Sequence, residues 1–244
     1  MQEELNHSRA AGRPVRRGRG ILRALLLIFA LLLIAALACA GWIYRAYRQE
    51  ITYYLEFGVK THISLADGDG DGLADNYDMV RAAREYVLSE PEYDGTYFAG
   101  GFPPEGRGVC TDVIWRAFAA AGYDFKAMVD ADIWDYGKEY PLPNGLLDKN
   151  IDFRRVINLQ VFFERNGETL TTDASQIDQW QPGDVVFYEG HVAMVSDRRN
   201  DQGVPWIIHH TGQGAFEEDA LTYKPIIGHY RWSAPESDPA GDSE

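Results

Sequence analysis

Three residues in this chain of 244 could together carry out nucleophilic chemistry: Cys110, His191 and His209. A cysteine thiolate attacks carbonyl carbons, one imidazole can take and return the proton, and a second polar ring can orient the first. We therefore predict that Cys110 is the nucleophile, that His191 carries the proton and that His209 fixes the tautomer of His191. A zinc site built from the same residues is disfavoured, because no fourth ligand and no CxxC or HxxxH spacing accompanies them.

Cys110 is expected at the start of a helix. Residues 91–109 are rich in Gly and Pro and predict a loop, whereas apolar residues recur at helical spacing through 111–121 and Gly122 is a natural stop. Free N–H groups and the positive end of the helix dipole favour a thiolate at such a position, and the Cys110 N–H is a natural oxyanion donor. Tyr97 is a candidate for the second donor. The alternative is a buried, inert thiol.

The two histidines fall in a part of the chain that predicts short strands, over 184–188, 191–196, 205–210 and 226–232. A hairpin centred near Asn200 would place His191 directly opposite His209 on one face of a sheet. His210 would point to the other face, since side chains alternate along a strand. A β-bulge would exchange the roles of His209 and His210.

Six oxygen donors follow calcium-loop spacing between residues 67 and 78. They are the side chains of Asp67, Asp69, Asp71, Asp75 and Asp78 and the carbonyl of Leu73, with Gly72 at the sharp turn. This is the spacing of an EF-hand loop, and it also resembles the Asp-rich calcium repeats of exported bacterial proteins. Asp78 stands where an EF-hand has Glu, so a weaker site is expected. We predict a structural Ca²⁺ here and no cofactor for catalysis; the alternative is an acidic, Gly-rich linker.

Residues 24–44 are 21 consecutive positions without a charge, enough to span about 30 Å as a helix. Arginines are in excess before this segment, which predicts a single-pass bacterial membrane protein with a cytoplasmic N-terminus and an extracytoplasmic body. The alternatives are a signal peptide cleaved after 36–38 or a lipid attached at Cys39.

Charge is distributed unevenly along the chain. Residues 1–50 hold eight Arg and three Glu, so residues 51–244 hold the remaining 15 basic and 34 acidic side chains, a net charge of −19. Such an acidic body is repelled by phosphate backbones, which argues against nucleic acid as a partner.

These features divide the chain into five expected parts. They are a cytoplasmic basic tail (1–23), a transmembrane signal anchor (24–44), a stalk with the calcium-like loop and a helix (45–90), a catalytic domain (91–232) and a disordered acidic tail (233–244).

The motifs around the three chemical residues resemble the NlpC-type branch of the papain-like cysteine peptidases and amidases. They also resemble, more closely and over about residues 95–232, a bacterial family catalogued only as domain of unknown function 1287. The matching segments are GVCTDVIWRAF, NIDFRRVINLQVFF, PGDVVFY, HVAMVSD, IIHHTGQG and IIGHYRW. That family usually has Asn where His210 stands, so the resemblance implies that His210 is not catalytic.

The resemblance implies an α+β, papain-like fold in which Cys110 begins a helix packed on a small antiparallel sheet. It further implies a thiol hydrolase that cleaves an amide or peptide bond through a thioester; together with the predicted anchor and extracytoplasmic location, this makes cell-wall peptide the first substrate to consider. The alternatives are a non-catalytic binding or scaffold module of the same fold and a thiol acyltransferase.

Overall fold

The computed structural model describes residues 17–233, except the side chains of 17–19, 45–47, 50 and 51. The chain forms two compact units, Met1–Ile51 and Thr52–Glu244. Most of the predicted basic tail and nearly all of the acidic tail lie outside the described residues.

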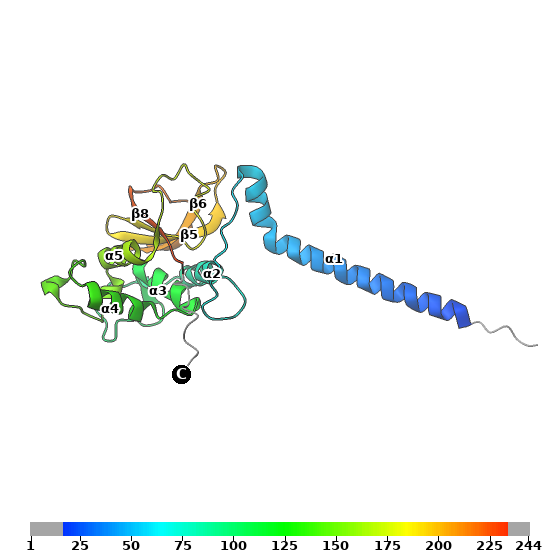
Figure 1. Cartoon of the computed structure of the whole chain (residues 1–244), viewed down its shortest axis with the longest axis horizontal. Coiled ribbons are helices and arrows are strands. Elements are labelled where there is room, and N and C mark those ends of the chain that lie inside the picture. The colour runs from blue at the N-terminus through cyan, green and yellow to red at the C-terminus, as the bar shows by residue number, and fades with distance from the viewer. Residues whose placement is uncertain (1–16, 234–244) are drawn as a thin grey trace, which may run out of the picture. The chain divides into compact units, whose positions relative to one another are not determined.

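One long helix, α1 (Arg17–Phe57), carries the predicted membrane segment (Figure 1). Its stretch Gly20–Tyr44 has a mean hydropathy of 2.8, and none of that stretch is buried inside the protein. A helix of this length and composition suits a membrane anchor or a signal sequence. The helix ends at Phe57, and Gly58 follows with a φ of 70°, the left-handed conformation that glycine adopts readily at a helix end.

The second unit is built from helices and one antiparallel sheet, which confirms the α+β class. The helices are α2 (Asp75–Leu88), α3 (Cys110–Ala120), α4 (Phe125–Tyr136) and α5 (Val156–Asn166), with short 3-10 turns η1 (Pro143–Gly145) and η2 (Asp152–Arg154). Strands β1 (Glu92–Tyr93) and β2 (Arg107–Gly108) form a small parallel pair. The main sheet contains β3 (Glu168–Thr169), β4 (Val185–Tyr188), β5 (His191–Arg199), β6 (Pro205–Thr211), β7 (Gly214–Glu218) and β8 (Ile226–Arg231), in the order β3-β8-β4-β5-β6-β7.

The sheet has two apolar faces because its central strands alternate buried side chains. On one face Val192 and Met194 pack with Val113 and Phe118 of α3, so the helix that begins at Cys110 lies on the sheet. The other face holds a second cluster: Trp180, Val186, Tyr188, Ala193, Val195, Ile207 and Leu221. Figure 1 shows the labelled strands β5, β6 and β8 to one side of helices α3 and α4. The sheet therefore has a core on each face, and every central strand is fixed in register.

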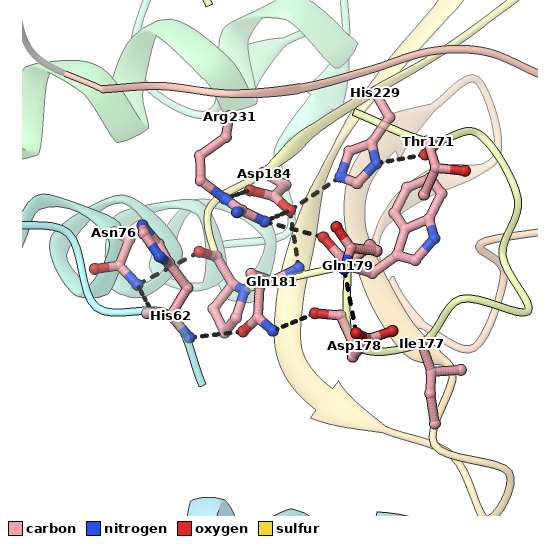
Figure 2. Close-up of polar contacts among 12 residues, drawn as sticks. His62, Asn76, Thr171, Ile177, Asp178, Gln179, Gln181, Asp184, His229 and Arg231 are labelled. Atoms are coloured by element: carbon pink, nitrogen blue, oxygen red, sulfur yellow. Dashed lines mark hydrogen bonds and ion pairs between the residues drawn. The ribbon is translucent and has the colours of Figure 1, made fainter. Parts of the chain in front are cut away.

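Residues at the foot of the predicted stalk pack onto the body. Val59 is buried, the His62 N–H donates to Gln181 Oε1 at 2.8 Å, and Asn76 Nδ2 donates to the His62 carbonyl at 3.0 Å. Figure 2 shows these contacts beside the turn that precedes β4. Residues 52–90, expected to form part of a stalk, thus belong to the same compact unit as the rest of the body.

A buried carboxylate organises this turn (Figure 2). Asp184 accepts hydrogen bonds from Arg231 Nε at 2.7 Å, from His229 Nε2 at 2.9 Å and from the Gln181 N–H at 2.8 Å. The His229 ring also stacks on Trp180 at 3.7 Å. Because Asp184 is 1% exposed and all of these partners are buried or half-buried, the cluster locks β8 to the start of β4.

Asp184→Asn should test this role. The amide keeps the shape but removes the charge that faces Arg231, so the free energy of unfolding should fall by about 3 kcal/mol. Urea unfolding of the full chain measures this loss. The exposed neighbour provides a control: Asp178→Asn should change stability by less than about 0.5 kcal/mol. Equal effects of the two substitutions would contradict the proposed importance of Asp184.

Candidate active site

Cys110 is the first residue of α3, as the sequence predicted. Cys110 is 4% exposed, and the backbone N–H groups of Val192, Thr111 and Cys110 itself act on its sulfur to lower the thiol pKa. Val192 follows His191 directly in β5. The sulfur therefore lies against the first residues of the strand that carries the predicted base.

A second buried carboxylate holds the start of α3 in place. Asp112 Oδ2 accepts from the Val109 N–H at 2.7 Å, and the same carboxylate is paired with Arg154 through two bonds of 2.9 and 2.8 Å. Arg154 also donates to the carbonyls of Asp94 and Thr96 in the loop before the helix. The ion pair is buried, with the Arg154 side chain at 1% exposure, so this side chain ties the loop to the helix.

Gly108 is needed where the loop enters the helix. A Cβ atom at this position would lie 2.3 Å from Tyr86 Oη and 2.9 Å from Asp112 Oδ2. No side chain larger than hydrogen fits between these two groups, so the backbone passes close to both of them.

His191 and His209 form the predicted pair. His191 Nε2 lies 3.0 Å from His209 Nδ1. The predicted register was wrong by two residues, because Met194 pairs with Ile208 and extending that register places His209 beside Ala193. A shift of two keeps both rings on one face, where they meet as diagonal neighbours.

His210 faces the other way and contacts Tyr86. Its Nδ1 lies 2.9 Å from Tyr86 Oη, and its ring meets that of Tyr93 edge-on at 5.2 Å. The structure thus keeps the predicted assignment of His209, and not His210, as the partner of His191.

Sequence reasoning missed Glu218. Its Oε1 lies 2.8 Å from His209 Nε2, and its side chain is half exposed at the end of β7. The sequence did contain a signal for this residue, namely a Gly-containing turn at 211–214 that could join β6 to a further strand. In the structure that strand pairs with β6 and sets Phe216 opposite His209. Glu218, two positions further on, then shares that face.

Glu218 determines which ring nitrogens of His209 and His191 carry protons. An ionised carboxylate only accepts, so His209 Nε2 carries a proton and its Nδ1 is an acceptor. His191 Nε2 must then donate to His209, which leaves His191 Nδ1 as the nitrogen with a free lone pair. This is the tautomer that can act as a base.

Burial sets the charge state of the resting site. It raises the pKa of the Cys110 thiol to about 11, outweighing the backbone hydrogen bonds that favour the thiolate. Burial, followed by the nearby His209 ring, lowers the pKa of His191 to about 3. The helix start was expected to favour a thiolate, yet in this structure thiol and imidazole are both neutral.

Tyr223 and the predicted oxyanion donor Tyr97 have different surroundings. The Tyr223 ring lies 6.1 Å from that of His191 and 5.8 Å from that of His209, and its pKa is raised to about 12, chiefly by burial. Tyr97, the predicted second oxyanion donor, instead donates to Asp148 and accepts from Asn150. The structure therefore places Tyr223, and not Tyr97, beside the two imidazoles.

The site lies within a segment that other proteins share. The family described as domain of unknown function (DUF1287) matches residues 80–232. The chain belongs to the DUF1287 family. It is also 34% identical over 189 residues to the uncharacterized protein YijF of Escherichia coli strain K12, covering 73% of this chain and 85% of that protein. No solved structure matches the chain.

The DUF1287 match includes Cys110, His191, His209 and Glu218, and the predicted calcium loop precedes it. In that loop, Asp67, Asp69 and Asp71 place carboxylate oxygens within 4.8 Å of one another. Asp75 accepts from the Gly68 N–H at 2.8 Å and from Tyr123, and the buried Asp78 is paired with Arg81. The predicted ligands Asp67, Asp69 and Asp71 thus converge on the surface, while Asp75 and Asp78 contact neighbouring residues. Leu73, whose carbonyl is the sixth predicted ligand, donates its N–H to Asp71 at 2.8 Å.

The neutral resting thiol predicts a distinctive reactivity profile. With Cys39→Ser removing the other thiol, alkylation of Cys110 by iodoacetamide should accelerate about tenfold per pH unit through pH 9, because the folded pKa is about 11. In urea the alkylation rate of the same thiol should level off above its ordinary pKa of about 8.5. A plateau already reached at neutral pH in the folded protein would instead reveal a preformed thiolate.

Proposed function

We propose that the protein is a thiol hydrolase of NlpC-like, papain-like architecture that cleaves an amide or peptide bond. The observation that carries this proposal is the ordered chain from Glu218 through His209 to His191, which ends at an imidazole lone pair next to the segment that contacts the Cys110 sulfur. A nucleophile, a base and an oriented third group are what acyl transfer requires.

In the first step, Cys110 gives its proton to His191 Nδ1 as the sulfur attacks the carbonyl carbon. His191 Nδ1 then returns that proton to the amine, the C–N bond breaks, and a thioester remains on Cys110. The N–H groups of Val192 and Thr111 stabilise the negative charge that develops on sulfur.

In the second step, water replaces the amine. His191 Nδ1 takes a proton from water, the oxygen attacks the thioester, and the carboxylic acid leaves as sulfur recovers the proton. Throughout, His209 and Glu218 keep His191 in the tautomer that accepts at Nδ1, since Glu218 can only accept.

The proposed location is the outer face of a bacterial membrane, with Gly20–Tyr44 as the anchor. The arginines before this segment favour a cytoplasmic N-terminus. Peptides of the cell wall are the proposed substrates, by analogy with the NlpC-type enzymes that the motifs resemble. The acidic body does not favour nucleic acid.

A second candidate function is a binding module without turnover. The observation that favours it is the burial of Cys110, whose thiol is 4% exposed with a pKa of about 11. Inert structural cysteines share these properties. A third candidate, acyl transfer, follows the same first step with an amine in place of water.

The test is hydrolysis of purified bacterial cell-wall peptides by the full chain in detergent. New amino and carboxyl groups should appear with the wild type, and Cys110→Ala or His191→Ala should abolish their release. Glu218→Gln, which permits both tautomers of His209, should slow release about tenfold. Glu189→Gln removes an exposed charge from the turn before β5 and should have no effect.

The three candidates give different results in this assay. Peptide bound equally by wild type and Cys110→Ala without new end groups would support the binding module and overturn the hydrolase. A product joined to an added amine, such as glycinamide, in place of free acid would identify acyl transfer.

We also propose that the loop 67–78 binds a structural Ca²⁺. The convergence of the Asp67, Asp69 and Asp71 carboxylates supports it, because calcium prefers several oxygen ligands and tolerates irregular geometry. Asp75 and Asp78 would complete the set together with the Leu73 carbonyl, once Asp78 exchanges its Arg81 contact for the ion. Burial, together with the acidic neighbours Asp71 and Asp69, raises the pKa of Asp78, and a cation would relieve that repulsion.

Calcium should therefore raise the melting temperature of the chain. At free calcium about 100-fold above its Kd, the free energy of unfolding should increase by about 2.7 kcal/mol. Melting with millimolar calcium or with a chelator measures the shift, which Asp69→Asn with Asp71→Asn should remove. Asp135→Asn, at another exposed acidic position, should retain it. An identical melting temperature with calcium and with chelator would refute the site.

A further inference from the structure

A hollow of about 360 Å³ lies between α2 and α3, away from the imidazole pair. Its charged and aromatic walls are Glu85 and Tyr86 of α2, Trp115 and Arg116 of α3, and Glu105 of the loop before β2. A volume of this size suits a small ligand of a few heavy atoms.

Arg116 lies in this hollow without an ion-pair partner among residues 17–233. Its guanidinium carbon lies 4.4 Å from the centre of the Trp115 ring and 4.9 Å from that of Tyr86. Its Nε is buried and has no hydrogen-bond acceptor among the residues that the structure describes. The two rings orient the guanidinium, and its charge has no ion-pair partner among the described residues, so the site favours an incoming anionic group.

Two carboxylates line the same hollow and are also unpaired. Within residues 17–233, neither Glu85 nor Glu105 forms an ion pair, with Arg116 or with any other cation, and both are exposed. Opposite charges therefore border one small cavity without neutralising each other. A purely anionic ligand would be repelled by the two glutamates, and a purely cationic one would meet Arg116.

We propose that this hollow binds a small zwitterion of amino-acid type. The ligand's carboxylate would pair with the Arg116 guanidinium, and its ammonium group would face Glu85 and Glu105. Apolar side-chain atoms would rest on Ala82 and Ala119, which also line the hollow.

Hydrogen bonds hold the two aromatic side chains of the hollow in place. Trp115 Nε1 donates to Asp112 Oδ1 at 2.6 Å, and Tyr86 Oη lies 2.9 Å from His210 Nδ1. Both rings are thus immobilised before a ligand arrives, which lowers the entropic cost of binding. The proposal uses none of the chemistry of Cys110 and stands independently of the hydrolase proposal.

Isothermal titration calorimetry of the full chain in detergent tests the inference with three probes: alanine, propionate and ethylamine. Propionate carries only the carboxylate and ethylamine only the ammonium group. Alanine should bind at least about tenfold more tightly than either, because it alone satisfies both charges. Propionate binding as tightly as alanine would overturn the zwitterion proposal, as would the absence of binding by all three.

Matched variants locate the site. Arg116→Gln should weaken alanine binding about tenfold or more, and Arg116→Lys should weaken it less, because the charge remains while the fork is lost. Glu85→Gln with Glu105→Gln should weaken alanine and not propionate. Lys60→Gln and Glu164→Gln, which remove exposed charges elsewhere, should leave binding unchanged.

Melting temperatures of the variants separate loss of binding from loss of folding. Undiminished alanine binding by a folded Arg116→Gln chain would place the site elsewhere and overturn the proposal.

Discussion

The interactions of the buried Asp112 carboxylate hold the residues around Cys110 in place. It accepts from the Val109 N–H at the start of α3, pairs with Arg154, and accepts from Trp115. Because Arg154 also holds two carbonyls of the preceding loop, one ion pair fixes the loop, the helix start and one wall of the hollow. An uncompensated charge would be costly at this depth, so each partner requires the other.

Desolvation governs the chemistry of the same region. Burial opposes charge on the sulfur and on His191 alike, so both groups are neutral in the structure; in the proposed reaction, charge would separate only when a substrate is bound. Glu218 is half exposed and remains in contact with water, while the two rings that it orders are buried. A solvated carboxylate can thus set the tautomer of a buried imidazole through one intervening ring.

Local patterns predicted much of this arrangement. A Gly- and Pro-rich approach followed by helical periodicity placed Cys110 at a helix start, and alternation along two strands placed His191 and His209 on one face. The exact register could not be predicted, since a turn of unknown geometry allows a shift of two without moving a side chain to the other face. Glu218 was missed because β7 was not recognised as a strand.

The sequence by itself determined which residues could react, the family to which the chain belongs, and the apolar segment long enough to cross a membrane. Those properties reside in residue type and short-range spacing. Only the tertiary structure decided the protonation state of Cys110, the engagement of Arg154 with Asp112 and the burial of the Arg116 Nε atom without a hydrogen-bond acceptor among the described residues. Each of these depends on desolvation and on contacts between segments far apart in the chain, which no local pattern encodes.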